Sequence, residues 1–190
     1  PADSSMCFGA FDDFENTYIV QDPSVIYHEF MHALVSIMMN YRNGTATASH
    51  PFRSGLGRFG YDEAFSINEG LADYFSYVMN QRSHFGEWAL GKTSNASRPL
   101  SERDPAHIPA LDTTPEGRLS YPTYVLYNPN NPDKPVEDEH YAGMIVSHYL
   151  TALTETLKTE CNLTAESDGG HDKATSYVML LVAETLAELG

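Results

Sequence analysis

The feature that most constrains the fold of this chain is the segment from residue 22 to about residue 40. It opens with Asp22-Pro23, which is typical of a helix start, because the acidic residue caps free N–H groups and proline suits the first helical position. Apolar side chains then surround the predicted helix almost completely: Val25, Ile26, Phe30, Met31, Leu34, Val35, Ile37, Met38 and Met39. A helix that is apolar on all sides is normally buried, so we expect this one to be buried.

Three ionisable side chains lie inside this apolar helix. His28, Glu29 and His32 form the pattern H-E-x-x-H, and the two histidines share one helical face with Cβ atoms about 5–6 Å apart. That spacing lets both imidazoles bind one zinc ion, with the glutamate placed to take a proton from a water molecule at the metal. The alternative is a pair of core histidines satisfied by backbone carbonyls. We favour the metal, because burying three unpaired ionisable groups would be costly.

Three further helices are predicted downstream, over residues 61–80, 140–160 and 171–189. The segments 41–60 and 83–138 are rich in turn-forming residues, and long irregular segments in a compact domain usually shape a site. The side chains expected to face the core are Ile67, Leu71, Tyr74, Phe75 and Val78 in the second helix, Tyr141, Met144, Ile145, Tyr149, Ala152 and Leu153 in the third, and Ala174, Val178, Leu181, Val182 and Leu186 in the fourth.

The predicted fold class is therefore mainly α, or α+β overall, with at most a small N-terminal β element within residues 6–20. A length of 190 residues favours a single domain, residues 1–190.

Two acidic residues of the second predicted helix stand out. Glu69 and Asp73 are four positions apart, on one face, and are the only acids between residues 64 and 86. Neighbouring carboxylates repel each other unless a positive group lies beside them. A zinc ligand and a hydrogen-bond acceptor for a ligand histidine would suit both residues, and a solvated acidic face is the alternative.

Together, the motifs H-E-x-x-H and N-E-G-x-A-D resemble those of the glutamate-zinc peptidases, the thermolysin and fungalysin group. The resemblance implies that His28, His32 and Glu69 bind one Zn²⁺ ion. It also implies that Glu29 is the general base and that Asp73 orients His28. The fold that it implies is a zincin-like helical catalytic domain.

Three weaker matches follow the same family pattern. The stretch H-Y-A-G at His140 resembles the H-x-x-G that opens a helix in fungalysin-type enzymes, which implies that His140 stabilises the transition-state oxyanion; a surface histidine is the alternative. Arg98, with Arg103 as its rival, is similar to an arginine that binds a substrate carbonyl. Tyr61 is similar in position to a second oxyanion donor, although a loop tyrosine is the competing interpretation. We expect His148 to be structural.

The chain departs from the family pattern in two respects. Thirty-six residues separate His32 from Glu69, more than is usual in thermolysin-like enzymes, and an inserted loop at 41–60 would account for them. Only 27 residues precede His28, where the family has a large β-rich half. We therefore expect either the catalytic part of a longer chain or a reduced member of the group.

These residues predict a zinc-dependent endopeptidase that hydrolyses peptide or protein substrates, with water as the nucleophile and Glu29 as the general base. One alternative is an aminopeptidase of the same group, which would need an acidic anchor for the substrate amine. The other is a non-catalytic, zinc-holding pseudo-peptidase that serves as a binding module. Since the group's members are mainly exported, the resemblance implies a secreted or cell-envelope protein.

Charge and composition exclude other classes of protein. With 11 basic and 26 acidic residues the net charge is −15, which is unsuited to nucleic acid or anionic lipid. The sequence contains no run of 18 apolar residues, so it predicts no membrane-spanning helix. Asp12, Asp13 and the acids of 133–139 are candidate Ca²⁺ ligands, with solvated acidic loops as the favoured interpretation. Cys7 and Cys161 either form one disulfide or are two buried thiols.

Overall fold

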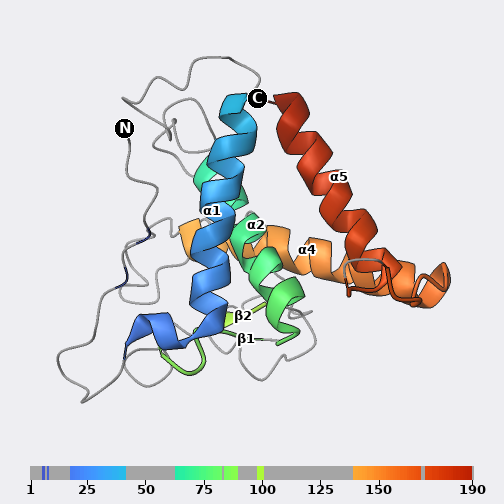
Figure 1. Ribbon diagram of the computed structural model, residues 1–190, viewed down its shortest axis with the longest axis horizontal. Coiled ribbons are helices and arrows are strands. Elements are labelled where there is room, and N and C mark those ends of the chain that lie inside the picture. Colours follow the sequence, from blue (N-terminus) through green and yellow to red (C-terminus); the bar gives the residue numbers. More distant parts are fainter. Residues whose placement is uncertain are drawn as a thin grey trace, which may run out of the picture.

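The computed structural model describes residues 6, 8, 18–41, 63–82, 84–89, 98–100, 139–167 and 170–189. This part of the chain is mainly helical (Figure 1). Its elements are the 3-10 helix η1 (Ile19–Gln21), the helices α1 (Pro23–Tyr41), α2 (Glu63–Asn80), α4 (Glu139–Glu160) and α5 (Lys173–Leu189), and the two-residue strands β1 (His84–Phe85) and β2 (Arg98–Pro99). The predicted fold class is confirmed, and each of the four predicted helices is present within two residues of its expected bounds.

The start of α1 follows the expected capping chemistry. Asp22 Oδ1 accepts a hydrogen bond from the backbone N–H of Ser24 at 3.0 Å, and Pro23 occupies the first helical position. Asp22 also makes contacts that the sequence does not indicate: its Oδ2 accepts hydrogen bonds from the backbone N–H groups of Trp88 at 3.1 Å and Ala89 at 3.0 Å. The cap therefore also joins the start of α1 to the segment that follows β1.

Helix α2 is the centre of the arrangement, because it packs against α1 on one side and α4 on another. Helix α4 crosses behind α1 and α2, while α5 contacts both α1 and α4 (Figure 1). The buried residues of the main core come from all four helices: Met31, Val35, Leu71, Ala72, Tyr74, Phe75, Val78, Leu150, Val178, Val182 and Leu186.

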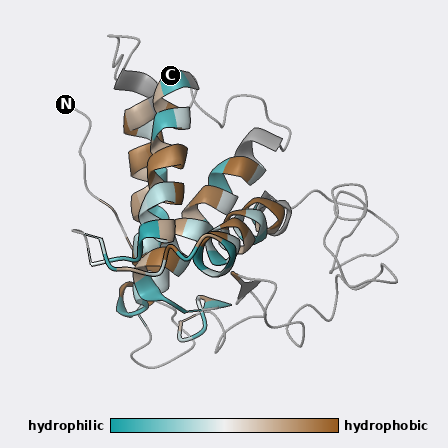
Figure 2. Ribbon diagram, turned by 90° about the vertical axis from the view of Figure 1, so that its right-hand side faces the viewer, coloured by the Kyte–Doolittle hydropathy of each residue, from teal (hydrophilic) through white to brown (hydrophobic). Residues whose placement is uncertain are grey.

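The expectation that α1 is buried on all sides is wrong. Phe30 is 43% exposed and Ile37 is 61% exposed, because the described neighbours of α1 cover only part of its circumference. Figure 2 shows hydrophobic and hydrophilic residues both present along the helices. Hydrophobicity alone therefore overstated the burial of α1.

Four further side chains expected in the core are instead exposed: Ile67, Tyr149, Ala152 and Leu181. The buried positions of α4 include the polar Ser147 and Thr154 beside the apolar Met144 and Leu150, whereas Tyr149 is 67% exposed. At Gly143, α4 approaches α2 too closely for a side chain. The hydrophobic pattern therefore did not identify the buried face of α4 correctly.

The described strands are antiparallel, with His84 opposite Pro99 and Phe85 opposite Arg98. They lie between α2 and α4 in the sequence, so this β structure is not the N-terminal element that we expected. Of residues 6–20, the structure describes 6, 8 and 18–20, and among these Tyr18 forms a β-bridge.

Two other expectations concern cysteines and membranes. Cys161 is an exposed free thiol, so it is not buried, and Cys7 lies outside the described residues. None of the helices in the described ranges is long and apolar enough to cross a bilayer.

Candidate metal centre

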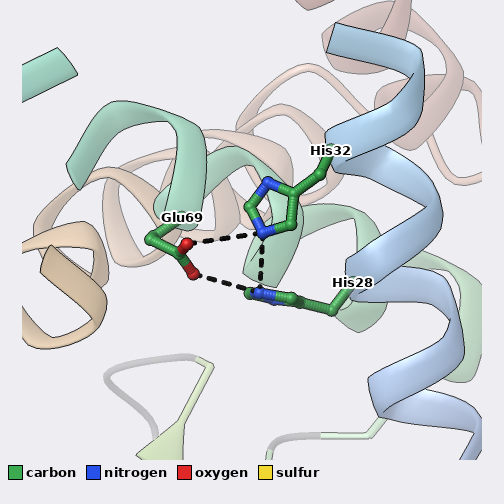
Figure 3. Close-up of side chains that lie close together, drawn as sticks. All are labelled: His28, His32 and Glu69. Carbon is green, nitrogen blue, oxygen red and sulfur yellow. Dashed lines mark hydrogen bonds and ion pairs between the residues drawn. The ribbon is translucent and has the colours of Figure 1, made fainter. Parts of the chain in front are cut away.

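Three side chains converge between α1 and α2 (Figure 3). His28 and His32 come from successive turns of α1, and Glu69 reaches them from the middle of α2. His28 Nε2 lies 3.0 Å from Glu69 Oε2, His32 Nε2 lies 3.4 Å from Glu69 Oε1, and the two Nε2 atoms are 3.1 Å apart. Residues at least 37 positions apart in the sequence are thus brought together, and this group could hold a metal ion.

Asp73 contacts the imidazole nitrogen of His28 that faces away from Glu69. Its Nδ1 lies 2.8 Å from Asp73 Oδ1, and Asp73 is 0% exposed. An ionised carboxylate can only accept a hydrogen bond, so His28 Nδ1 is the donor to Asp73, and Nε2 is the nitrogen that faces Glu69. Such a carboxylate behind a histidine is the usual way in which proteins orient a metal-binding imidazole.

The chemistry of the three facing atoms fits a bound cation. Two imidazole nitrogens and a carboxylate oxygen all present lone pairs, and they would repel one another without a cation or a shared proton between them. Zinc bonds of about 2.0–2.2 Å at tetrahedral corners place ligand atoms about 3.3–3.6 Å apart. The observed separations of 3.0 to 3.4 Å, which involve both carboxylate oxygens of Glu69, are close to that value.

The pKa values of Glu69 and His32 are both shifted by their contacts in this group. Burial alone would raise the pKa of Glu69, but hydrogen bonds and charge from His28 and His32 hold it well below its usual range. Burial opposes protonation of His32, yet the hydrogen bond and charge of Glu69 outweigh it and raise the pKa of His32. The carboxylate is therefore ionised and attracts positive charge to this position.

Asn68 is a neighbour of His32 that sequence reasoning missed as a site residue. Its side chain contributes to the raised pKa of His32. Asn68 Oδ1 and His32 Nδ1 are both buried, and neither has a hydrogen-bond partner in the part of the chain that the structure describes. The signal was present, since Asn68 is the first letter of the N-E-G-x-A-D motif.

Phe85 packs against His28, a contact that the sequence did not indicate. Its ring centroid lies 4.8 Å from that of His28, and its side chain is buried. No local pattern marks this residue, because its position depends on the packing of β1. Arg98 is opposite Phe85 in β2, so its backbone runs one strand away from the residue that contacts His28. The side chain of Arg98 lies outside what the structure describes.

The other predicted site residues differ in how close they lie to the group of His28, His32 and Glu69. Glu29 is exposed on α1 between the two histidines, and its negative charge contributes to the raised pKa of His32. His140, near the start of α4, has a side chain 48% exposed, with Nε2 3.7 Å from Glu69 Oε2. His148 is buried farther along α4 and is not part of the three-residue group. Tyr61 and Arg103 lie outside the described residues, as do Asp12, Asp13 and 133–138 among the candidate calcium ligands.

No protein-family model matches the chain, and neither a curated protein nor a solved structure matches it. The function is therefore inferred from the geometry of the site and from the motifs that form it.

Proposed function

We propose that this protein is a zinc-dependent endopeptidase similar to the thermolysin and fungalysin group. The observation that supports this proposal most is the convergence of His28, His32 and Glu69, with His28 oriented by Asp73. Two imidazoles and one carboxylate from adjacent helices form a donor set that catalytic zinc sites use.

The number of ligands favours a catalytic over a structural role for the metal. Structural zinc sites are closed by four protein ligands, whereas catalytic sites have three and leave one position for water or substrate. The metal-binding group within the described ranges has three members, His28, His32 and Glu69. Zinc bound there would polarise a substrate carbonyl and make a water molecule more acidic.

Glu29 is the residue that we propose moves the proton. Its carboxylate is exposed, so both water and substrate can reach it, and it is on the same helix as both histidine ligands. As general base it accepts a proton from the attacking water at one carboxylate oxygen, and it then returns this proton to the leaving amine. His140, half exposed beside Glu69, is the proposed donor to the oxyanion of the tetrahedral transition state.

The experiment that tests the proposal combines zinc content with peptide hydrolysis. Zinc per chain is measured by elemental analysis for the parent protein, Glu69→Ala and Glu29→Gln, and turnover is measured on a mixed peptide library. Glu184→Gln is the matched control, because it makes the same substitution at an exposed position on α5. We expect one zinc per parent chain, a much weaker hold in Glu69→Ala, and a zinc-loaded Glu29→Gln protein with turnover reduced by about 10²–10⁴-fold.

Two results would contradict the proposal. A parent protein that binds one zinc but hydrolyses no peptide would be a zinc-holding binding module instead. A parent protein that takes up no zinc, even when the metal is supplied in excess, would remove the basis of the site.

A further inference from the structure

Two glycines, Gly70 of α2 and Gly143 of α4, lie against each other where these helices cross. A methyl group added to Gly143 would lie 2.8 Å from the backbone nitrogen of Gly70 and 2.9 Å from both the backbone oxygen of Ser66 and Cβ of Glu69. A methyl group on Gly70 would press on the backbone oxygen of Gly143 and lie 2.6 Å from Cβ of Val146. These separations are well below van der Waals contact, so neither position has room for a side chain.

Space, and not backbone conformation, accounts for both glycines. The glycines with positive φ in the described ranges are Gly86 and Gly170, so the backbone at Gly70 and Gly143 is one that any residue can adopt. Both glycines lie inside helices, where glycine is a poor choice compared with alanine. Their benefit is therefore the close approach of the two helices.

Both glycines are next to residues of the proposed centre. Gly70 follows Glu69 directly, and Gly143 is one helical turn after His140. The crossing accordingly sets the separation of Glu69 and His140, whose Oε2 and Nε2 atoms are 3.7 Å apart. The contacts of His28 and His32 with Glu69, and of His28 with Asp73, are made between α1 and α2, and α4 supplies none of these atoms.

We infer that Gly70 and Gly143 are positioning residues, whose missing side chains hold His140 at the metal centre by letting α4 approach α2. The role of His140 in turnover rests on the proposed peptidase function, whereas the control of its distance from Glu69 does not. Because the atoms that block a methyl group are largely backbone, α4 would have to move away by roughly half an ångström or more to accommodate one. Misplacement of about 1 Å in an active site can cost about 10²-fold in rate.

The test is Gly143→Ala, with Ala152→Leu as the control that adds bulk at an exposed position of α4. Crystal structures give the separation of His140 Nε2 and Glu69 Oε2, elemental analysis gives zinc per chain, and peptide hydrolysis gives kcat/KM. We expect Gly143→Ala to widen the separation, to retain its zinc, and to lower kcat/KM by roughly 10- to 100-fold. We expect Ala152→Leu to match the parent in all three measurements.

A double-variant cycle separates positioning from general damage. If Gly143 acts through His140, then Gly143→Ala should reduce kcat/KM strongly in the parent and only slightly when His140 is already alanine. Equal losses in the two backgrounds, or an unchanged separation in the Gly143→Ala crystal, would overturn the inference.

The failure of the proposed function remains distinguishable. If the parent hydrolyses no peptide, the peptidase proposal fails, while the crystallographic separation still decides whether the glycines position His140. If neither Gly143→Ala nor Gly70→Ala folds, the parent crystal structure decides. A crossing with room for a methyl group would overturn the inference, and a crossing as close as the present one would support it.

Discussion

His28 Nδ1 and Asp73 Oδ1 lie 2.8 Å apart, although 45 positions separate the two residues in the sequence. The contact joins α1 to α2 and determines which nitrogen of His28 faces Glu69. A core histidine satisfied by a backbone carbonyl, the alternative considered from the sequence, would not need a buried carboxylate. The pairing therefore favours a metal-binding role for this histidine.

Replacing Asp73 by asparagine should weaken zinc binding by about 10- to 100-fold. The carboxylate of Asp73 orients His28 and makes its imidazole more basic, and the asparagine side chain lacks that negative charge. The measurement is the zinc Kd by competition with a chelating dye, with Glu184→Gln as the control. An unchanged Kd in Asp73→Asn would show that the contact has no part in metal binding.

Removing zinc should lower the thermal stability of the protein. A ligand present at 100 times its Kd stabilises the folded state by about 2.7 kcal/mol. For a domain of this size that corresponds to a decrease in Tm of roughly 5–10 °C when a chelator removes the metal. Calorimetry with and without chelator measures it, and Glu69→Ala should show little of the shift. An equal Tm with and without chelator in the parent would contradict the prediction.

The helix positions and the core of the site follow from the sequence because they depend on local patterns. Asp22-Pro23 predicts the start of α1, and the i, i+4 spacing of His28 and His32 places both on one face. The contacts of Phe85 and the buried face of α4 could not be predicted in this way. They result from how elements pack, and a helix crossing formed by Gly70 and Gly143 carries no hydrophobic signal.

Removing the carboxylate of Asp22 should be unusually destabilising for a helix cap. Asp22→Ala removes the acceptor for Ser24 and also for the backbone N–H groups of Trp88 and Ala89. A cap alone contributes about 0.5–2 kcal/mol, and each buried donor left without a partner adds about 1–3 kcal/mol. Urea denaturation should therefore give a loss of more than about 2 kcal/mol in the free energy of unfolding. A loss under about 0.5 kcal/mol would mean that water replaces these contacts.

The ion pair between Lys158 and Asp172 should make stability depend on pH. Lys158 Nζ lies 2.9 Å from Asp172 Oδ2, and Asp172 Oδ1 accepts a hydrogen bond from the N–H of Thr175 at 2.8 Å. Burial would raise the pKa of Asp172, but these hydrogen bonds and the charge of Lys158 lower it. Because the folded pKa is below the unfolded value of about 3.9, the stabilisation is complete above that pH and is lost as pH falls through the folded pKa.

The matched variant for this ion pair is Asp172→Asn, which retains an oxygen for the helix cap and removes the charge. At pH 7 the parent should exceed it by up to about 1 kcal/mol in the free energy of unfolding, since the pair is partly exposed. The difference should shrink as the pH falls below about 4. A difference that is constant from pH 7 to pH 3 would exclude the charge as its cause.

The central claim, that His28, His32 and Glu69 together bind one zinc ion, is tested most directly by a crystal structure of the purified protein with data collected on both sides of the zinc absorption edge. We predict a single anomalous peak at about 2.0–2.2 Å from His28 Nε2, His32 Nε2 and an oxygen of Glu69. Zinc-supplemented crystals with no peak between these three side chains, or with zinc bound only elsewhere, would contradict it.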